Sequence, residues 1–212
     1  MNVPLKSTML APLDLSPFFD KHPVLETERL LLRPITIDDK EAIYDFYSDP
    51  EIMKYRVSPL HKSIEDTVQF IETDCMNFAE RKRIRFGIAL KASGTLIGTG
   101  GFHSISPEHH RLEIGYSLRR EFWGQGYMTE AVTELIRFAF EDMGMHRIMA
   151  MCDLGNDRSA RVMERCGMTF EGTLKDYALR RGKFVTVRIY AILKEPPPSF
   201  AKEGGEDATR RY

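Results

Sequence analysis

The apolar residues of this chain change their spacing abruptly across a short segment that contains two glycines. In segment 111–118 they alternate, which is typical of a β-strand with one buried face. From Met128 onward they recur every three to four positions, which is typical of an α-helix. The helical face comprises Met128, Ala131, Val132, Leu135, Ala139 and Met143. A strand that passes into a helix through Gly124 and Gly126 requires a fold of the α/β class.

Strand and helix patterns also follow one another along the rest of the chain. Extended runs are predicted at 25–35, 85–90, 95–102 and 147–152, and helices at 38–48, 64–79 and 156–167. The run 147–152 is apolar on both faces, which is typical of a strand covered by helices on either side. Residues 169–193 predict a long hairpin that turns at Arg181 and Gly182.

The length of the chain fits one domain. With 212 residues, of which 42% are hydrophobic, it can bury one sizeable core. We expect an N-terminal extension at 1–22, the domain at 23–195 and a tail at 196–212. The tail is rich in proline, glycine and charge, so we expect it to be disordered.

Composition excludes several classes of partner. The formal net charge is -1, so no global attraction to nucleic acid or to an anionic membrane is expected. Pro4, Pro12 and Pro17 interrupt the first residues, which therefore predict neither a signal peptide nor a spanning segment. These features favour a cytoplasmic protein.

No metal site is predicted. Cys75, Cys152 and Cys166 include no CxxC pair, so we interpret them as reduced thiols in the core. His103, His109 and His110 are the alternative source of metal ligands, but neighbouring side chains on a strand point apart. We therefore interpret the histidines as part of a solvated loop.

The two glycines predict an anion site. The first turn of a helix has unpaired N–H groups and the positive end of the helix dipole, and glycines before it let a phosphate approach the backbone. A tight turn without a ligand is the alternative. A dinucleotide fingerprint would need a third glycine where Thr129 stands, and no Gly-Lys-Ser/Thr phosphate loop is present.

The motifs "LEIGYSLRREFWGQGYMTEAV" and "NDRSARVMERCGM", with the opening "LETERLLLRPITIDDKEAIYDFYSDPEIMKY", resemble the GNAT superfamily of acyl-CoA N-acyltransferases. They are most similar to its ribosomal-protein N-terminal acetyltransferase branch, and the resemblance covers about residues 24–193. It implies a mixed, mostly antiparallel central sheet flanked by helices. It also implies that the sheet splays near Tyr116, Ser117 and Leu118, whose freed backbone would pair with pantetheine.

The resemblance further implies which residues bind the pyrophosphate of acetyl-CoA. By position these are Trp123, Gly124, Gln125, Gly126, Tyr127, Met128 and Thr129. The family's leading Arg or Gln of this loop is replaced by Glu121, so Arg119 or Arg120 is expected to assist the backbone amides.

Glu113 is the candidate general base. Amines have pKa values of about 8 to 10, so an acceptor amine must lose a proton before it can attack a thioester. Glu113 shares the strand face of Gly115 and Ser117, and GNAT enzymes often place a catalytic glutamate on this strand. The alternative is a strand glutamate that faces solvent.

Asn156 and Ser159 form a second candidate group. Asn156 could simply cap the helix that follows it. In the family's NxxS pattern, the Asn contacts pantetheine or substrate and the Ser lies near the thioester sulfur. Many GNAT enzymes carry a Tyr as general acid further along this helix, but Met163 stands there, so Ser159, Tyr177 or solvent must replace it.

The expected reaction is direct acetyl transfer from acetyl-CoA to a primary amine without a metal. The acceptor is a protein N-terminus, as in the ribosomal branch, or a small molecule such as a polyamine, an amino acid or an antibiotic. A non-catalytic acyl-CoA-binding module is the alternative from another class. A monomer or a homodimer fits the sequence equally well.

Overall fold

The computed structural model describes residues 10–56 and 58–194. The tail predicted at 196–212 and the first nine residues of the predicted extension lie outside that part of the chain. The strands are β1 (Leu25–Glu26), β2 (Leu30–Pro34), β3 (Ile84–Leu90), β4 (Leu96–Ser106), β5 (Arg111–Leu118), β6 (Arg147–Asp153), β7 (Thr169–Arg180) and β8 (Lys183–Leu193). The α-helices are α1 (Ser16–Asp20), α2 (Lys40–Tyr47), α3 (Pro50–Met53), α4 (Ile64–Ala79), α5 (Tyr127–Glu141) and α6 (Asp157–Arg165). Single 3-10 turns occupy Ile37–Asp39, Pro107–His109 and Arg120–Phe122.

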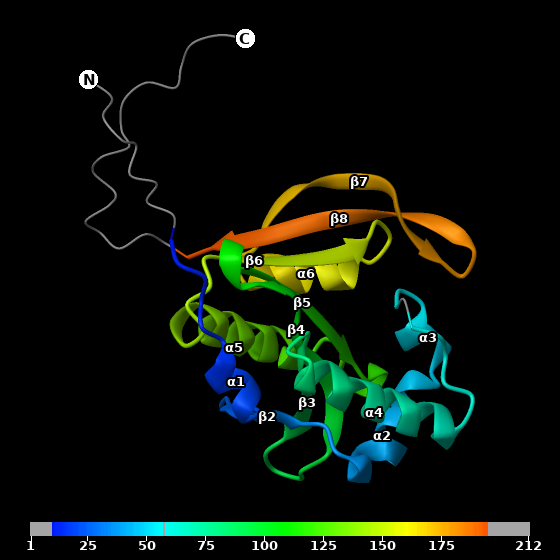
Figure 1. The fold of residues 1–212 in the computed structure, drawn as a ribbon. Coiled ribbons are helices and arrows are strands. Elements are labelled where there is room, and N and C mark those ends of the chain that lie inside the picture. The colour runs from blue at the N-terminus through cyan, green and yellow to red at the C-terminus, as the bar shows by residue number, and fades with distance from the viewer. Residues whose placement is uncertain (1–9, 57, 195–212) are drawn as a thin grey trace, which may run out of the picture.

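The strands form one sheet in the order β1-β2-β3-β4-β5-β6-β8-β7 (Figure 1). All neighbours are antiparallel except β5 and β6. This confirms the predicted mixed, mostly antiparallel sheet. The parallel pair extends only from Arg111 opposite Arg147 to Glu113 opposite Met149. Beyond Glu113 the two strands separate, so the β6-facing edge of Tyr116 to Leu118 has no strand partner in the described chain.

The two faces of the sheet carry different helices. A large core that includes Leu112, Ile114 and Leu135 packs α5, α6 and α1 against one face. A smaller core that includes Ile43, Tyr47 and Ile71 packs α2, α3 and α4 against the other, as Figure 1 shows. The site therefore has two sides, one on each face of the sheet, that meet where β5 and β6 diverge.

Most predicted elements are present, with three corrections. The strand expected over 25–35 is two strands, because Thr27 turns the chain: its N–H donates to the carbonyl of Leu30 at 2.9 Å and its Oγ1 accepts from the N–H of Leu30 at 3.0 Å. The strand 147–152 is buried at alternate positions, since Met151 faces the cleft described below. Cys75 is exposed, because the buried side of α4 follows Thr67 and Ile71.

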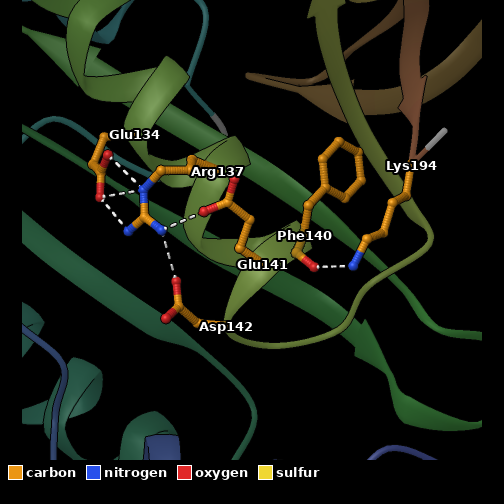
Figure 2. Close-up of polar contacts among 6 residues, drawn as sticks. All are labelled: Glu134, Arg137, Phe140, Glu141, Asp142 and Lys194. Atoms are coloured by element: carbon orange, nitrogen blue, oxygen red, sulfur yellow. Dashed lines mark hydrogen bonds and ion pairs between the residues drawn. The ribbon is translucent and has the colours of Figure 1, made fainter. Parts of the chain in front are cut away.

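Charged side chains cluster at the C-terminal end of α5. Arg137 contacts Glu134, Glu141 and Asp142, and Lys194 donates from Nζ to the carbonyl of Phe140 at 2.6 Å (Figure 2). Cations at a helix C-terminus interact favourably with the helix dipole. The Arg137 contacts lie within α5 and its C-cap, and the Lys194 contact joins the end of this helix to the residue after β8. No helix in the described ranges is both long and apolar enough to cross a membrane.

Candidate active site

A cleft of about 1320 Å³ connects the two faces of the sheet. It extends from the turn before α5, through the opening between β5 and β6, to the sheet surface beside α3 and α4. Most of the site residues predicted from the sequence line it: Glu113, Tyr116, Ser117, Leu118, Trp123, Gly124, Gly126, Tyr127, Met128, Thr129, Asn156 and Ser159. Arg119 and Gln125 do not line the cleft: the guanidinium of Arg119 pairs with Glu121 at 2.8 Å, and the side chain of Gln125 donates to the carbonyl of Glu121 at 2.7 Å.

The turn before α5 presents free backbone donors. Gly124 and Gly126 have φ values of 77° and 83°, a left-handed conformation that favours glycine. The indole N–H of Trp123 donates to the carbonyl of Leu118 at 2.8 Å and ties the turn to β5. Within residues 10–56 and 58–194, the amides of segment 124–129 have no hydrogen-bond acceptor. Such a row of free N–H groups at a helix N-terminus fits a pyrophosphate.

The cation beside this turn was not predicted. Arg29, in the turn between β1 and β2, donates from Nη1 to the carbonyl of Gln125 at 3.2 Å and from Nε to Glu130 at 2.6 Å. Arg120, one of the two expected helpers, lies 3.7 Å from Asp49 instead. Arg29 therefore supplies a cation beside a turn whose leading position carries Glu121.

Glu113 lies in a largely buried part of the cleft. Its side chain is 18% exposed, which overturns the alternative of a solvent-facing glutamate. Burial raises the pKa of the Glu113 carboxyl to about 6. At neutral pH it is still ionised and is a stronger base than an ordinary glutamate.

His103 is the nearest ionisable neighbour of Glu113. It belongs to β4, directly opposite Glu113, and its Nε2 lies 3.8 Å from the carboxylate, so the solvated-loop interpretation is wrong for this residue. Burial, with Arg83 and Arg85 nearby, lowers the pKa of His103 to about 4, so it is neutral at pH 7.

Asn156, Ser159 and Tyr116 meet on the other side of the opening. Oδ1 of Asn156 accepts from the N–H of Ser159 at 3.3 Å, which confirms that Asn156 caps α6. Oγ of Ser159 lies 3.0 Å from the hydroxyl of Tyr116, whose pKa burial raises well above its usual value. The sequence indicated only a backbone role for Tyr116. Met163 is fully buried, and Tyr177 is 53% exposed.

No metal centre is apparent in the described part of the chain, where no three or more His, Cys, Asp or Glu side chains are arranged to hold an ion. His110 contacts the carbonyl of Ala11 at 2.9 Å through Nε2.

Comparison with known proteins agrees with this geometry. Residues 29–169 match the acetyltransferase (GNAT) domain family. The uncharacterized N-acetyltransferase YoaA of Bacillus subtilis (strain 168) is 36% identical over 172 residues, which cover 81% of this chain and 97% of that protein. The [ribosomal protein uS5]-alanine N-acetyltransferase of Escherichia coli (strain K12) is 34% identical over 100 residues, or 47% of this chain and 52% of that protein.

One similar solved structure contains acetyl-CoA. The microcin C7 self-immunity acetyltransferase MccE, in complex with acetyl-CoA and AMP, superimposes with a TM-score of 0.72. It is 26% identical, and the match covers 79% of this chain and 94% of that one. The chain therefore belongs to the GNAT family and is an N-acetyltransferase that uses acetyl-CoA.

Proposed function

We propose that the protein transfers the acetyl group of acetyl-CoA directly to a primary amine, with Glu113 as the general base. The observation that carries this proposal is the burial of Glu113, which raises its pKa to about 6, in the same cleft as the free amides before α5. Burying a carboxylate that has no cationic partner costs free energy. Groups with pKa values shifted in this way are found preferentially at functional sites, where a raised pKa suits proton abstraction.

The backbone does most of the work on the donor side. The amides of segment 124–129 bind the pyrophosphate, and Arg29 stiffens the loop that presents them. The unpaired edge of β5 at Tyr116, Ser117 and Leu118 binds pantetheine. Asn156 caps α6 through Oδ1, and its amide N–H₂ is available to donate a hydrogen bond to pantetheine.

Two proton steps accompany the transfer. Glu113 first takes a proton from the ammonium form of the acceptor, and the neutral amine then attacks the thioester carbon to form the C–N bond. As the C–S bond breaks, the proton that the bonded nitrogen sheds passes to the departing sulfur. The single hydroxyl hydrogen of Tyr116 donates either to the carbonyl or to Oγ of Ser159, and in the second arrangement the hydrogen of Ser159 is free to stabilise that sulfur. Tyr116 thus positions Ser159, which replaces the proton donor that Met163 cannot be.

The α-amine of a protein N-terminus is the favoured acceptor. The match to the uS5-alanine N-acetyltransferase supports this class, and the wide cleft leaves room for an extended peptide. A small amine is the second candidate, supported by the likeness to MccE, whose structure holds AMP. A non-catalytic acyl-CoA-binding module would need no general base, so it would not explain the buried carboxylate of Glu113.

Thiol release from acetyl-CoA tests the proposal. The purified protein is incubated with a panel of peptides and small amines, and the acetylated product is identified by mass spectrometry. We expect release that depends on the amine and is lost in Glu113→Gln. Tight acetyl-CoA binding without amine-dependent release would instead indicate a binding module.

A further inference from the structure

The acceptor side of the cleft has a floor without side chains. Gly101 of β4 and Gly115 of β5 are direct partners in the sheet, so two adjacent positions have no side chain. Glu113 and Ser117 flank Gly115 on the same face of β5. A Cβ atom on Gly115 would lie 3.2 Å from Nε2 of His103, so a larger residue would crowd this space. The imidazole of His103 therefore lies over Gly115 in this depression, which has the candidate base at one end and Ser117 at the other.

A guanidinium group closes the end at Ser117. Arg56 donates from Nη1 to Oγ of Ser117 at 2.7 Å and from Nη2 to the hydroxyl of Tyr47 at 3.0 Å. Its Nε is buried and has no hydrogen-bond partner. In the described chain no carboxylate forms an ion pair with Arg56, although a half-buried cation normally has one.

Two further arginines line the cleft near this depression, Arg85 from β3 and Arg83 from the residue just before that strand. Arg85 is the partner of Gly101 in the sheet, and its Nε lies 3.3 Å from Asp74 of α4. Arg83 also lines the cleft, and none of its described neighbours forms a salt bridge with it. Burial and the charge of Arg85 lower the pKa of Arg83. Of these three guanidinium groups, only that of Arg85 is paired with a carboxylate, Asp74.

This positive charge is not placed to ionise the base. A nearby cation would lower the pKa of Glu113, but that pKa is raised, with burial as its cause. The arginines thus do not lower the pKa of Glu113, and their positive charge is available to bind a different anion.

Resting on the proposed function, we propose that the acceptor amine carries an anionic group, a carboxylate or a phosphate, that binds to Arg56 and Arg83. The amine lies at Glu113 and the anion at the opposite end of the glycine floor. Glu113 and Ser117 are four positions apart on β5, or about 13 Å between Cα atoms, and the side chains shorten that gap from both ends. Acceptors of this class are amino acids, phosphorylated amines and peptides with an acidic residue beside the N-terminus. Polyamines are disfavoured, because the arginines would repel their second cation.

Matched acceptors that differ only in the anion test this assignment. Phosphoethanolamine is compared with ethanolamine, L-alanine with L-alaninamide, and a peptide that begins Ala-Asp with one that begins Ala-Asn. A hydrogen bond to a charged group contributes about 1.5–3 kcal/mol, so we expect kcat/KM to favour the anionic member of at least one pair by roughly 10- to 100-fold. The pair with the largest ratio identifies the source of the anion. Arg83→Gln should reduce that ratio at least about 5-fold, because it removes one of the two cations.

Lys82→Gln is the matched control, since Lys82 is exposed, pairs with Glu80 at 2.5 Å and does not line the cleft. It should keep the wild-type ratio. Calorimetry of each acceptor with the CoA-bound protein provides a readout independent of turnover, and melting temperatures verify that the variants are folded. Equal turnover and equal binding within every pair would overturn the inference and leave the proposed function intact. An anion preference in binding without any thiol release would support the inference and contradict the proposed function.

Discussion

The hydroxyl of Tyr116 lies 3.0 Å from Oγ of Ser159, so a residue of β5 and a residue of α6 meet across the opening where β5 and β6 separate. Tyr116 also lies 3.1 Å from the carbonyl of Ser159. A phenol from the strand thus reaches the helix at a point where Met163 is packed into the core. The contact joins the two elements that border the expected thioester position.

Tyr116→Phe tests this contact. Loss of the hydroxyl should lower kcat, because Ser159 loses the hydrogen-bond partner that positions its own hydroxyl near the sulfur. The Kd for acetyl-CoA should change little, and the free energy of unfolding should fall by about 1 kcal/mol for one buried hydrogen bond. In a double-mutant cycle with Ser159→Ala, the losses in kcat should be less than additive. Strictly additive losses would mean that the two hydroxyls act independently.

Glu113→Gln tests the base. The amide keeps the shape of the side chain but cannot accept a proton, so kcat/KM should fall by about 10²- to 10⁴-fold. In the wild type, kcat/KM should rise with pH through an apparent pKa near 6 as Glu113 ionises. That acid limb should disappear in the variant. An unchanged limb would assign the base to another group.

The same substitution should raise stability. Burial raises the pKa of Glu113 from 4.5 to about 6, so the folded state holds its proton more tightly than the unfolded state. Stability is therefore lost as pH rises from 4.5 through 6, by on the order of 1–2 kcal/mol at pH 8. Gln does not ionise and avoids this loss. Chemical denaturation should show Glu113→Gln as the more stable protein at pH 8, with the difference vanishing at pH 4.

The features that the sequence predicted are those with a local signal. The switch from alternating to helical spacing located β5 and α5, and the glycines located the turn between them. Contacts between distant segments leave no such signal. Arg29 and Glu130 are 101 positions apart, and neither residue is unusual in its own segment.

The same limit applies to side chains whose partners lie on another element. Alternation assigns a face of β5 to Tyr116, but only the packing of α6 brings its hydroxyl to Ser159. Arg56 follows a four-residue helix that has no periodic pattern to predict it. Cleft chemistry that depends on such packing requires the three-dimensional structure.

Gly126→Val tests the loop. At a φ of 83° a β-branched residue is strained, and its Cβ would lie 3.4 Å from Nη2 of Arg29, at the place where the pyrophosphate would approach. The Kd for acetyl-CoA should rise at least about 10-fold. Gly94→Val is the control, because Gly94 has a φ of 72° in a turn outside the cleft. It carries a similar strain and should keep wild-type affinity, whereas equal affinity in both variants would move the pyrophosphate site elsewhere.

Two substitutions separate the two proposed roles of Asn156, the helix cap and the contact with the ligand. The cap depends on Oδ1, which accepts from the N–H of Ser159 at 3.3 Å. Asn156→Asp keeps this acceptor and adds a favourable charge at a helix N-terminus, so the melting temperature should hold. Asn156→Ala removes the cap and should cost about 1 kcal/mol of stability.

Activity should follow a different order from stability. If the amide N–H₂ of Asn156 holds pantetheine or substrate, both variants lack that donor, and kcat/KM should fall in each by about 10- to 100-fold, or roughly 1–3 kcal/mol. The loss in Asn156→Asp is the informative one, because its helix remains capped and a carboxylate would face the ligand's carbonyl groups. Wild-type kinetics in Asn156→Asp together with a lower melting temperature in Asn156→Ala would reduce the residue to a helix cap. In that outcome the orientation of the acyl donor would rest on the free edge of β5 and the amides before α5.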